Sequence, residues 1–285
     1  MDNLNTLGIR KISKRNKEYP DCFKHLANPP SSFFLKGVLR QSKYSLAIVG
    51  RRRASQESLA FANKVAYKLA NAGVTIISGM ATGVDSAAHQ GALKAGGYTI
   101  AVLGSGLDIC YPFYNLKIFK QIEETGCLMS EYPPGTRPYP ANFPRRNRLI
   151  SSLAESCLIV EASLKSGTMI TANFAAEQGK DVLVVPGAFG ASSWQGSNQL
   201  IKDGAIVVTS VEDIADHFNI KLEKDTINIT ADEKNVLEQL KEAQLDIDQL
   251  VAKTKYKVYE ISQLLITLEI KGLVRKDLSN RYFVV

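Results

Sequence analysis

The sequence predicts an α/β protein with a doubly wound, mostly parallel sheet and a small C-terminal winged-helix domain. From residue 45 onward, short apolar runs alternate with segments of helical periodicity. Alternating strands and helices build a parallel sheet with right-handed crossovers and helices on both faces. After residue 230 the pattern changes to three short helices followed by two strands, which is the element order of a winged helix-turn-helix.

Seven apolar runs are the predicted strands of the sheet. Each run is nearly continuous in apolar residues, which is typical of strands buried on both faces. The runs occupy residues 45–50, 74–79, 99–104, 127–132, 156–162, 181–187 and 205–210. The segment after the first run predicts a helix with one apolar face, made by Leu59, Ala62, Val65, Ala66 and Leu69. Ser55 suits the N-cap of this helix and Gly73 suits its end.

These patterns divide the chain into four regions. Residues 1–44, interrupted by Pro29, Pro30 and Gly37, predict an N-terminal arm with a short helix and an extended segment packed on the core. The other three regions are a Rossmann-like domain, a polar linker and the winged-helix domain, at residues 45–220, 221–230 and 231–285. In the last region, helices are predicted at 232–242, 246–253 and 257–270, before a hairpin with a Ser-Asn turn.

Length and composition limit the class of protein. The chain has 285 residues, of which 45% are hydrophobic and 22% charged, and this excludes a disordered chain. No apolar stretch approaches the ~20 residues that a membrane-spanning helix needs. The basic start of the chain lacks the apolar core of a secretory signal. We therefore expect a cytoplasmic protein without a membrane span.

The net charge of +7 is concentrated at one end of the chain. Residues 1–53 carry 12 Lys and Arg against 3 Asp and Glu, whereas residues 54–230 are slightly acidic and residues 231–285 are balanced. A local basic excess indicates a polyanionic partner. Basic termini are also common on proteins without such a partner, so the charge alone leaves both interpretations open.

Glycine, serine, threonine and arginine gather where the predicted strands end. The carboxyl ends of parallel strands share one edge of the sheet, where ligands of such sheets bind. Glycines let a backbone approach a phosphate closely, and free N–H groups at helix starts favour anions. Four loops therefore predict a phosphate-binding rim, with Gly50, Arg51, Arg52, Arg53 and Ser55 in the first, Gly79, Thr82 and Gly83 in the second, Gly104, Ser105 and Gly106 in the third, and Lys165, Ser166, Gly167 and Thr168 in the fourth.

None of these loops is a known nucleotide-binding motif. A G-x-x-x-x-G-K-[ST] sequence is absent, and the turn from Gly104 to Gly106 does not complete G-x-G-x-x-G. The basic triplet from Arg51 to Arg53 suits an extended phosphate backbone better than a dinucleotide. We therefore expect no cofactor.

A second cluster combines an aromatic ring with guanidinium groups. After a proline-rich loop, Phe143 precedes Arg145, Arg146, Asn147 and Arg148. In single-strand binding, bases stack on such rings while arginines hold phosphates. The alternative is a buried Phe143 with its neighbouring arginines in ion pairs. At least one of these arginines is expected to pair with Glu131, Glu155 or Glu161.

The remaining polar residues predict structural roles, with no catalytic residue and no metal site. Asp85 and His89 lie four residues apart on one helix, which more often supports a loop or cap than builds an acid–base pair. The cysteines show no C-x-x-C spacing, and Cys127 and Cys157 open apolar runs, so we expect buried free thiols. Trp194 lies in a Ser- and Gly-rich loop, where it either closes the rim or stacks on a ligand.

Several segments together resemble the DNA-processing protein A (DprA/Smf) family. They follow one another from about residue 19 to 218 and include IISGMATGVDSAAHQGAL at 76–93, YTIAVLGSGLDICYP at 98–112, FPRRNRLISSL at 143–153 and VEASLKSGTMITA at 160–172. The resemblance implies an extended Rossmann-like fold that binds single-stranded DNA and self-associates, as a homodimer. It also implies help in loading the RecA recombinase onto strands displaced from single-strand-binding protein during natural transformation, and no catalytic turnover.

The resemblance assigns roles to two residues and shows two departures. Gly50, Arg51 and Arg52 align with the family's Gly-Ser-Arg, so Arg52 is the expected phosphate contact, and Phe143 is the expected base-stacking residue. Arg51 stands in place of a small serine, which strengthens the positive charge but crowds the anion pocket. Many relatives carry a helical domain before the position of Met1, and its functions are not transferred here.

Two other functions remain open. A nucleotide or nucleoside-monophosphate hydrolase of the lysine-decarboxylase-like Rossmann group would need a P-G-G-x-G-T loop and an acidic helper, and the chain offers only Ser166-Gly167-Thr168. A sequence-specific regulator would need a basic recognition helix. The helix from Tyr256 to Ile270 contains only Lys257, with Lys255 just before it, which favours a winged helix that contacts protein.

Overall fold

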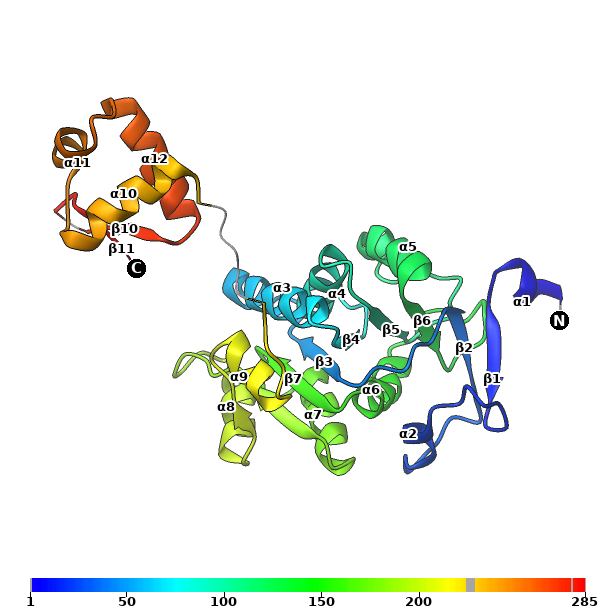
Figure 1. Ribbon diagram of the computed structural model, residues 1–285. Coiled ribbons are helices and arrows are strands. Elements are labelled where there is room, and N and C mark those ends of the chain that lie inside the picture. Colours follow the sequence, from blue (N-terminus) through cyan, green and yellow to red (C-terminus); the bar gives the residue numbers. More distant parts are fainter. Residues whose placement is uncertain (1, 224–228, 278, 285) are drawn as a thin grey trace. The chain divides into compact units, whose positions relative to one another are not determined.

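The computed structural model describes residues 2–223, 229–277 and 279–284, and the chain divides into two compact units (Figure 1). The first unit is Met1–Glu223 and the second is Lys224–Val285. The polar linker proposed at 221–230 spans this division, and its residues 224–228 lie outside the described part of the chain.

The described residues of the first unit form one nine-stranded sheet in the order β1-β2-β6-β5-β4-β3-β7-β8-β9. The seven predicted runs are its parallel strands, and the predicted fold class is confirmed. These strands are β3 Ser45–Gly50, β4 Thr75–Ser78, β5 Thr99–Leu103, β6 Cys127–Ser130, β7 Ser156–Val160, β8 Asp181–Val184 and β9 Ile206–Val207. Strands β4, β5, β6 and β7 flank β3 in the middle of the sheet and are buried along their length, which explains their continuous apolar sequence.

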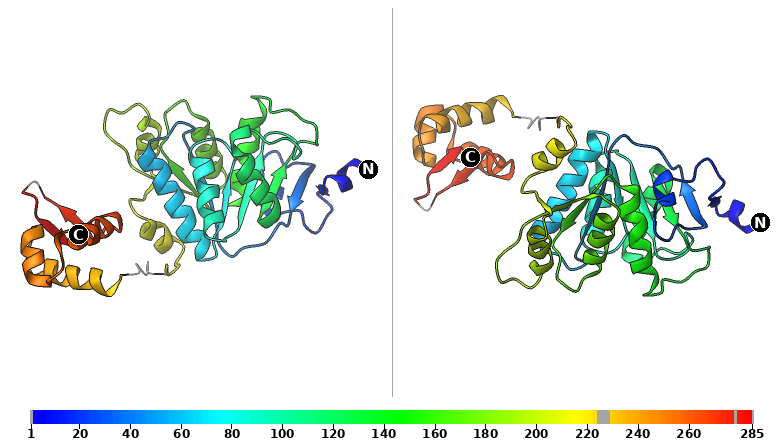
Figure 2. Two further views of the ribbon diagram at one scale, coloured as in Figure 1. Left: turned by 90° about the horizontal axis from the view of Figure 1, so that it is seen from above. Right: turned by 90° about the horizontal axis from the view of Figure 1, so that it is seen from below.

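Helices cover both faces of the sheet (Figures 1 and 2). One face is covered by α3 Gln56–Asn71, α4 Val84–Lys94, α5 Leu116–Thr125 and α9 Val211–His217. The other face is covered by α6 Asn142–Leu153, α7 Gly167–Glu177 and α8 Gln195–Lys202. Successive residues of β3 alternate between the two layers, with Ile48 in the first and Val49 in the second.

The predicted boundaries of α3 are confirmed. Ser55 is the N-cap, and its hydroxyl accepts a hydrogen bond from the backbone N–H of Ser58 at 3.1 Å. Gly73 follows the helix with a φ of +86°, a conformation that glycine adopts without steric cost. The helix therefore starts at the carboxyl end of β3, next to the loop that contains Arg51, Arg52 and Arg53.

The winding direction of the sheet reverses at β3. From β3 the chain continues to β4, β5 and β6 on one side, and α6 then carries it back to β7 on the other side of β3. Such a reversal opens a crevice at the carboxyl ends of the strands, where open α/β sheets bind ligands. Gly50 and Val160 are paired at this point.

The N-terminal arm adds two strands to the sheet. In the arm, β1 pairs antiparallel with β2, and β2 pairs antiparallel with β6. Two aromatic residues of the arm, Phe23 in α2 and Phe33 in β2, have fully buried rings that make an edge-to-face contact with centroids 5.5 Å apart. The elements of the arm are α1 Asp2–Thr6, β1 Arg10–Ser13, α2 Asp21–Lys24 and β2 Ser32–Gly37.

The second unit has the predicted winged-helix arrangement of three helices and an antiparallel hairpin. Its elements are α10 Ala231–Glu242, α11 Ile247–Thr254, α12 Val258–Ile270, β10 Val274–Lys276 and β11 Tyr282–Val284. Thr230 with Glu233 and Asp246 with Gln249 form capping boxes at the first two helices. Because α12 begins at Val258, the helix itself contains no Lys or Arg.

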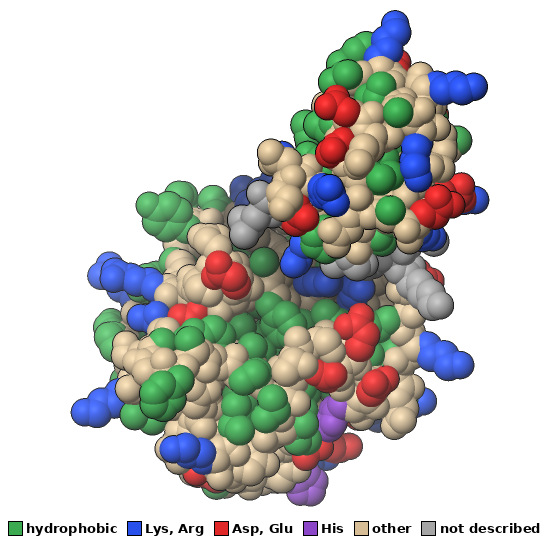
Figure 3. Space-filling model, turned by 90° about the vertical axis from the view of Figure 1, so that its left-hand side faces the viewer, with side chains coloured by type: hydrophobic (Ala, Val, Ile, Leu, Met, Phe, Trp, Pro, Cys, Tyr) green, Lys and Arg blue, Asp and Glu red, His purple; other side chains and the backbone are tan. Residues whose placement is uncertain are grey.

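The surface charge is mixed. On the face drawn in Figure 3, basic and acidic side chains of the described residues are interspersed, with apolar side chains between them. The net positive charge does not gather into a single-sign patch on this face.

We expect Gly50→Ala to destabilise the protein, because a Cβ at this position would lie 2.0 Å from the carbonyl oxygen of Val160. Backbone atoms of paired strands cannot move aside cheaply, and overpacking of this kind costs about 1–3 kcal/mol. The matched control is Gly167→Ala, whose Cβ would meet no heavy atom within 4 Å. Urea unfolding of both variants should show a loss for Gly50→Ala only, and equal free energies of unfolding would contradict this account.

Candidate nucleic-acid interface

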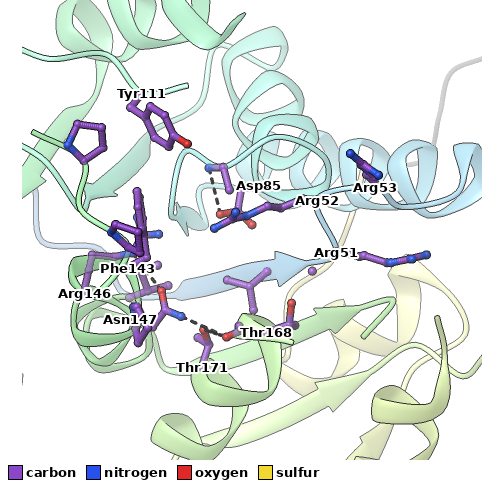
Figure 4. Close-up of a pocket in the computed structure, with 18 residues that line it drawn as sticks. Arg51, Arg52, Arg53, Asp85, Tyr111, Phe143, Arg146, Asn147, Thr168 and Thr171 are labelled. Atoms are coloured by element: carbon purple, nitrogen blue, oxygen red, sulfur yellow. Dashed lines mark hydrogen bonds between the residues drawn. The ribbon is translucent and has the colours of Figure 1, made fainter. Parts of the chain in front are cut away.

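A cavity of about 590 Å³ opens at the carboxyl edge of the sheet, where the winding direction reverses (Figure 4). Its wall is made by the segments that follow β3, β4, β5, β6 and β7. The sequence-predicted residues that line it are Gly50, Arg51, Arg52, Arg53, Phe143, Arg146, Asn147, Gly167 and Thr168. The structure therefore brings the first and fourth predicted loops together with the Phe143 cluster.

Arg146 connects the ends of two strands inside this wall. Its guanidinium Nη1 donates to the carbonyl oxygen of Gly79 at 2.6 Å and to that of Val102, and Nε donates to Asn147 Oδ1 at 3.1 Å. A Cβ on Gly79 would lie 2.7 Å from the guanidinium, so glycine provides the space that Arg146 fills. Burial lowers the pKa of Arg146 to about 10, and the side chain is still charged at neutral pH.

Asp85 faces Arg146 and holds the loop after β4. Its carboxylate accepts hydrogen bonds from the backbone N–H groups of Gly79 at 3.2 Å and Ala81 at 3.3 Å. Burial raises the pKa of Asp85, while the positive charges of Arg146 and Arg52 oppose that shift. The loop-supporting role that the sequence predicts for Asp85 agrees with this geometry.

His89 is fully buried away from the cavity wall. Thr99 donates its hydroxyl hydrogen to the carbonyl oxygen of Ile76, so it accepts a hydrogen bond from the N–H at Nδ1 of His89 at 2.8 Å. Burial lowers the pKa of His89 to about 3, with a smaller contribution from the Arg146 charge. A neutral imidazole beneath α4 fits the predicted structural role.

Phe143 and Arg52 form the mouth of the cavity. The half-buried ring of Phe143 packs on Tyr111 with centroids 5.7 Å apart, and Gly104 leaves room for the ring, since a Cβ there would lie 2.8 Å from it. The Arg52 guanidinium carbon lies 5.8 Å from the Phe143 ring centroid, within the range of a cation–π contact. Arg52 is exposed and has no hydrogen-bond or ion-pair partner among the described residues, although its charge acts on Asp85.

Arg51 points away from the cavity centre and is paired (Figure 4). The buried carboxylate of Glu161 accepts from Arg51 Nη1 at 3.1 Å and from the backbone N–H of Ser55 at 2.7 Å. Burial raises the pKa of Glu161, but these hydrogen bonds outweigh it, so the net shift is downward. Arg51 and Ser55 thus fix the loop after β3, and the positive charge of Arg51 is largely neutralised.

The arginines of the Phe143 cluster lie in different places, because residues 142–153 form helix α6. Successive side chains on a helix point about 100° apart. Arg145 is exposed, Arg146 is in the cavity wall, and Arg148 is buried beside a second cavity. Arg148 Nη2 donates to both carboxylate oxygens of Glu131 at 2.8 and 2.7 Å, as expected for at least one arginine of this cluster.

The remaining predicted loop residues either connect parts of the cavity wall or lie outside its lining. Within the lining, Asn147 Nδ2 donates to the carbonyl oxygen of Gly167 at 3.2 Å, which ties α6 to the start of α7. Gly83 has a φ of +81° and lies against the carbonyl oxygen of Arg51. The residues of the predicted rim that do not line the cavity, among those the structure describes, are Ser55, Gly79, Thr82, Gly83, Gly104, Ser105, Gly106, Lys165 and Ser166.

Sequence reasoning missed Tyr111 as a residue of the site. It lies after the Gly104–Gly106 turn, is 46% exposed, and lines the cavity beside Phe143. The signal available in the sequence was an aromatic residue at the end of a strand-terminal loop. Trp194 does not line this cavity, and its ring packs on Gly187 instead.

The remaining predictions concern thiols, metals and membranes. Cys127 and Cys157 are buried free thiols, as predicted, and burial raises their pKa to about 12. The described His, Cys, Asp and Glu side chains form no group of three that could hold a metal ion. Across the described ranges, no helix is both long and apolar enough to cross a membrane.

The fold and the cavity define a class of α/β protein with an arginine-lined cavity at the switch point of an open sheet and a winged-helix unit that follows in the sequence. Residues 10–219 match the family model of DNA recombination-mediator protein A, and residues 223–277 match that of the DprA winged helix domain. The chain belongs to the DNA recombination-mediator protein A family, so the predicted resemblance to DprA/Smf proteins is confirmed.

Individual relatives agree with this assignment. The chain is 32% identical to Protein Smf of Synechocystis, over 95% of this chain and 79% of that protein. It is 39% identical to DNA processing protein DprA of Streptococcus pneumoniae, over 73% and 77%. The X-ray structure of S. pneumoniae DprA matches with a TM-score of 0.70 and 35% identity, over 79% of each chain. A DprA structure from Helicobacter pylori, which concerns the single-stranded DNA binding mode of that protein, matches with a TM-score of 0.68 and 30% identity, over 74% of this chain and 95% of that one.

We expect Arg146→Ala to destabilise the protein far more than Arg145→Ala, although the two arginines are neighbours in sequence. Removing Arg146 leaves Asp85 buried without its counter-charge and two carbonyl groups without a donor, which costs about 3–5 kcal/mol. Arg145 is exposed, so its replacement should change the free energy of unfolding by less than about 0.5 kcal/mol. Urea unfolding monitored by circular dichroism measures the free energy of unfolding of both variants. Similar losses in the two variants would rule out the assigned role of Arg146.

We expect His89 to make the protein less stable as pH falls. An unfolded histidine binds a proton near pH 6.5, whereas folded His89 does so only near pH 3. Since the unfolded chain binds more protons in between, stability should fall by about 2 kcal/mol between about pH 8 and pH 5 through this group. His89→Gln should remove that part of the pH dependence, and an unchanged slope would show that His89 titrates normally.

Proposed function

We propose that this protein binds single-stranded DNA along the rim cavity and acts as a recombination mediator. The observation that carries the proposal is the pair at the cavity mouth, where the exposed Arg52 guanidinium lies 5.8 Å from the ring of Phe143. Membership of the DNA recombination-mediator family supports the same function. The single-stranded DNA binding mode described for the H. pylori relative supports the choice of ligand.

The cavity offers separate groups for the two parts of a nucleotide. Arg52, with Arg53 beside it, supplies positive charge for phosphates, while Gly167 and Thr168 present the N-terminal end of α7, where free N–H groups favour anions. Phe143 supplies a ring on which an unpaired base can stack. In a duplex the bases are already stacked and paired, so this combination favours a single strand.

The residues predicted to contact DNA have two different roles in this proposal. Arg52, Arg53 and Arg145 are exposed and remain candidates for phosphate contacts. Three other arginines already have partners: Arg51 pairs with Glu161, Arg146 donates to two strand-end carbonyl groups, and Arg148 pairs with Glu131. We therefore assign these three arginines to holding the site in shape. Two glycines of the rim act in the same indirect way, since Gly79 makes room for Arg146 and Gly104 makes room for Phe143.

The wider role follows the family. We infer that the protein forms a homodimer in the cytoplasm and helps load RecA onto incoming strands displaced from single-strand-binding protein during natural transformation. The winged-helix unit serves as a protein-contact module, since α12 contains no basic residue and exposes Val258, Tyr259, Ile266 and Ile270.

We expect Arg52→Ala to weaken binding of a labelled single-stranded oligonucleotide by about 10-fold or more, the effect of losing one charge-assisted contact. The slope of log affinity against log salt should fall in magnitude by about 0.7 for each lost phosphate contact. Lys43→Ala is the matched control, because Lys43 is an exposed cation just before β3, at the opposite end of the same strand. Mobility-shift titrations at several salt concentrations measure the affinity and its salt dependence for both variants.

Three outcomes would overturn the proposal. The first two are equal affinity for single- and double-stranded oligonucleotides, and an Arg52→Ala variant that binds like wild type. The third is release of free base from nucleoside monophosphates, which would favour the hydrolase alternative. The same preparation serves all three measurements.

A further inference from the structure

We propose that Phe113 and Tyr114 form a second base-stacking site, which receives bases of the strand as it leaves the rim cavity. The inference rests on the proposed binding of single-stranded DNA and extends it to a surface outside the cavity. Neither residue lines the cavity itself. Both lie in the single turn η1 Phe113–Asn115, directly before α5.

The two rings are exposed and do not pack in the hydrophobic core. Phe113 is 75% exposed and Tyr114 is 94% exposed, whereas Ile118, Phe119 and Ile122 of the following helix are buried. The apolar face of α5 is therefore already packed, and the two aromatic rings lie outside it. Aromatic rings left in water forgo a large burial energy, which makes an adjacent exposed pair informative when it borders a ligand site.

The turn that carries these rings is fixed to the cavity wall. Asn115 is buried, and its Nδ2 donates to the carbonyl oxygen of Met80 at 2.7 Å and of Ala81 at 3.4 Å. Its Oδ1 accepts from the hydroxyl of Ser86 at 3.1 Å. Met80 and Ala81 belong to the loop after β4 that Asp85 holds, and Ala81 lines the cavity. The rings are thus presented on a rigid support, which lowers the entropic cost of stacking.

The exposed pair lies close to the aromatic residues at the mouth of the cavity. Phe143 packs on Tyr111 at the mouth, and Phe113 follows Tyr111 by two residues, so their Cα atoms are at most about 8 Å apart. Lys117 lies one helical turn beyond, is exposed, and has no ion-pair partner among the described residues. An aromatic surface with a cation beside it is the pattern that binds single strands with little sequence preference.

The test compares a strand that has bases with one that has only the backbone. The double variant Phe113→Ala, Tyr114→Ala should bind an oligothymidylate about 5-fold to 150-fold more weakly than wild type for each lost stack, the equivalent of ~1–3 kcal/mol. Its affinity for an abasic oligonucleotide of the same length and charge should be unchanged. The matched control is the double variant Phe113→Tyr, Tyr114→Phe, which keeps both rings and should bind both ligands like wild type.

The outcomes separate this inference from the proposed function. If the alanine variant binds oligothymidylate like wild type while Arg52→Ala is impaired, the second site is wrong and the cavity function stands. An equal loss on both ligands would also overturn stacking. If wild type binds neither ligand, the proposed function and this inference fail together. Unchanged DNA binding with loss of self-association would instead assign the two rings to a protein contact.

A second measurement reports stacking directly. Tyr114→Trp places an indole in the exposed turn, and its fluorescence should be quenched when oligothymidylate is added but not when the abasic strand is added. The single native tryptophan, Trp194, packs on Gly187 and provides the background signal, which is measured in the unsubstituted protein. Quenching of equal size with both strands would contradict the inference.

Discussion

The buried guanidinium of Arg146 is the contact on which the rim depends. An arginine out of reach of water is tolerated only where its donors and its charge are satisfied. Here the partners are the carbonyl oxygens of Gly79 and Val102, the amide oxygen of Asn147 and the charge of Asp85. These groups belong to the ends of β4 and β5, to α6 and to α4. One side chain thereby fixes the relative positions of two strands and two helices, and α6 in turn positions Phe143.

Much of the fold follows from sequence pattern alone, for a clear physical reason. Strands β3 to β9 are short apolar runs because a parallel strand is buried on both faces, and the winged helix shows in the order of its elements. The sequence pattern did not predict that the arm adds two strands, β1 and β2, to the sheet. Strand β1 lies at the edge of the sheet and has no continuous apolar run. Strand β2 does contain the apolar run Phe33-Phe34-Leu35, but it pairs with β1 and with β6, which lies about a hundred residues away. Non-local pairing of this kind leaves little local signal.

The sequence predicted which residues gather at the candidate site more accurately than it predicted the contacts that each of them makes. Charge and glycine content indicated the edge of the sheet at which the cavity lies, and Arg52 and Phe143 do meet there. Sequence could not assign separate tasks to neighbouring arginines, because those tasks depend on helix geometry and on distant acids. Arg148 meets Glu131 and Arg51 meets Glu161 only after folding. The hydrogen bonds of Asn115, which hold an exposed turn to the cavity wall, likewise join residues about 35 positions apart.

Two glycines matter to this surface although they offer a ligand no side chain. Gly79 leaves the space that the Arg146 guanidinium fills, and Gly104 leaves the space that the Phe143 ring occupies. Each glycine and its partner form one complementary shape, so a larger residue at either glycine position would collide with that partner. A lineage that enlarges position 79 must give up the arginine, and one that enlarges position 104 must move the ring. We therefore expect the shape of the rim to be inherited as two linked pairs, Gly79 with Arg146 and Gly104 with Phe143, and such covariation would mark the rim even in relatives whose exposed arginines have diverged.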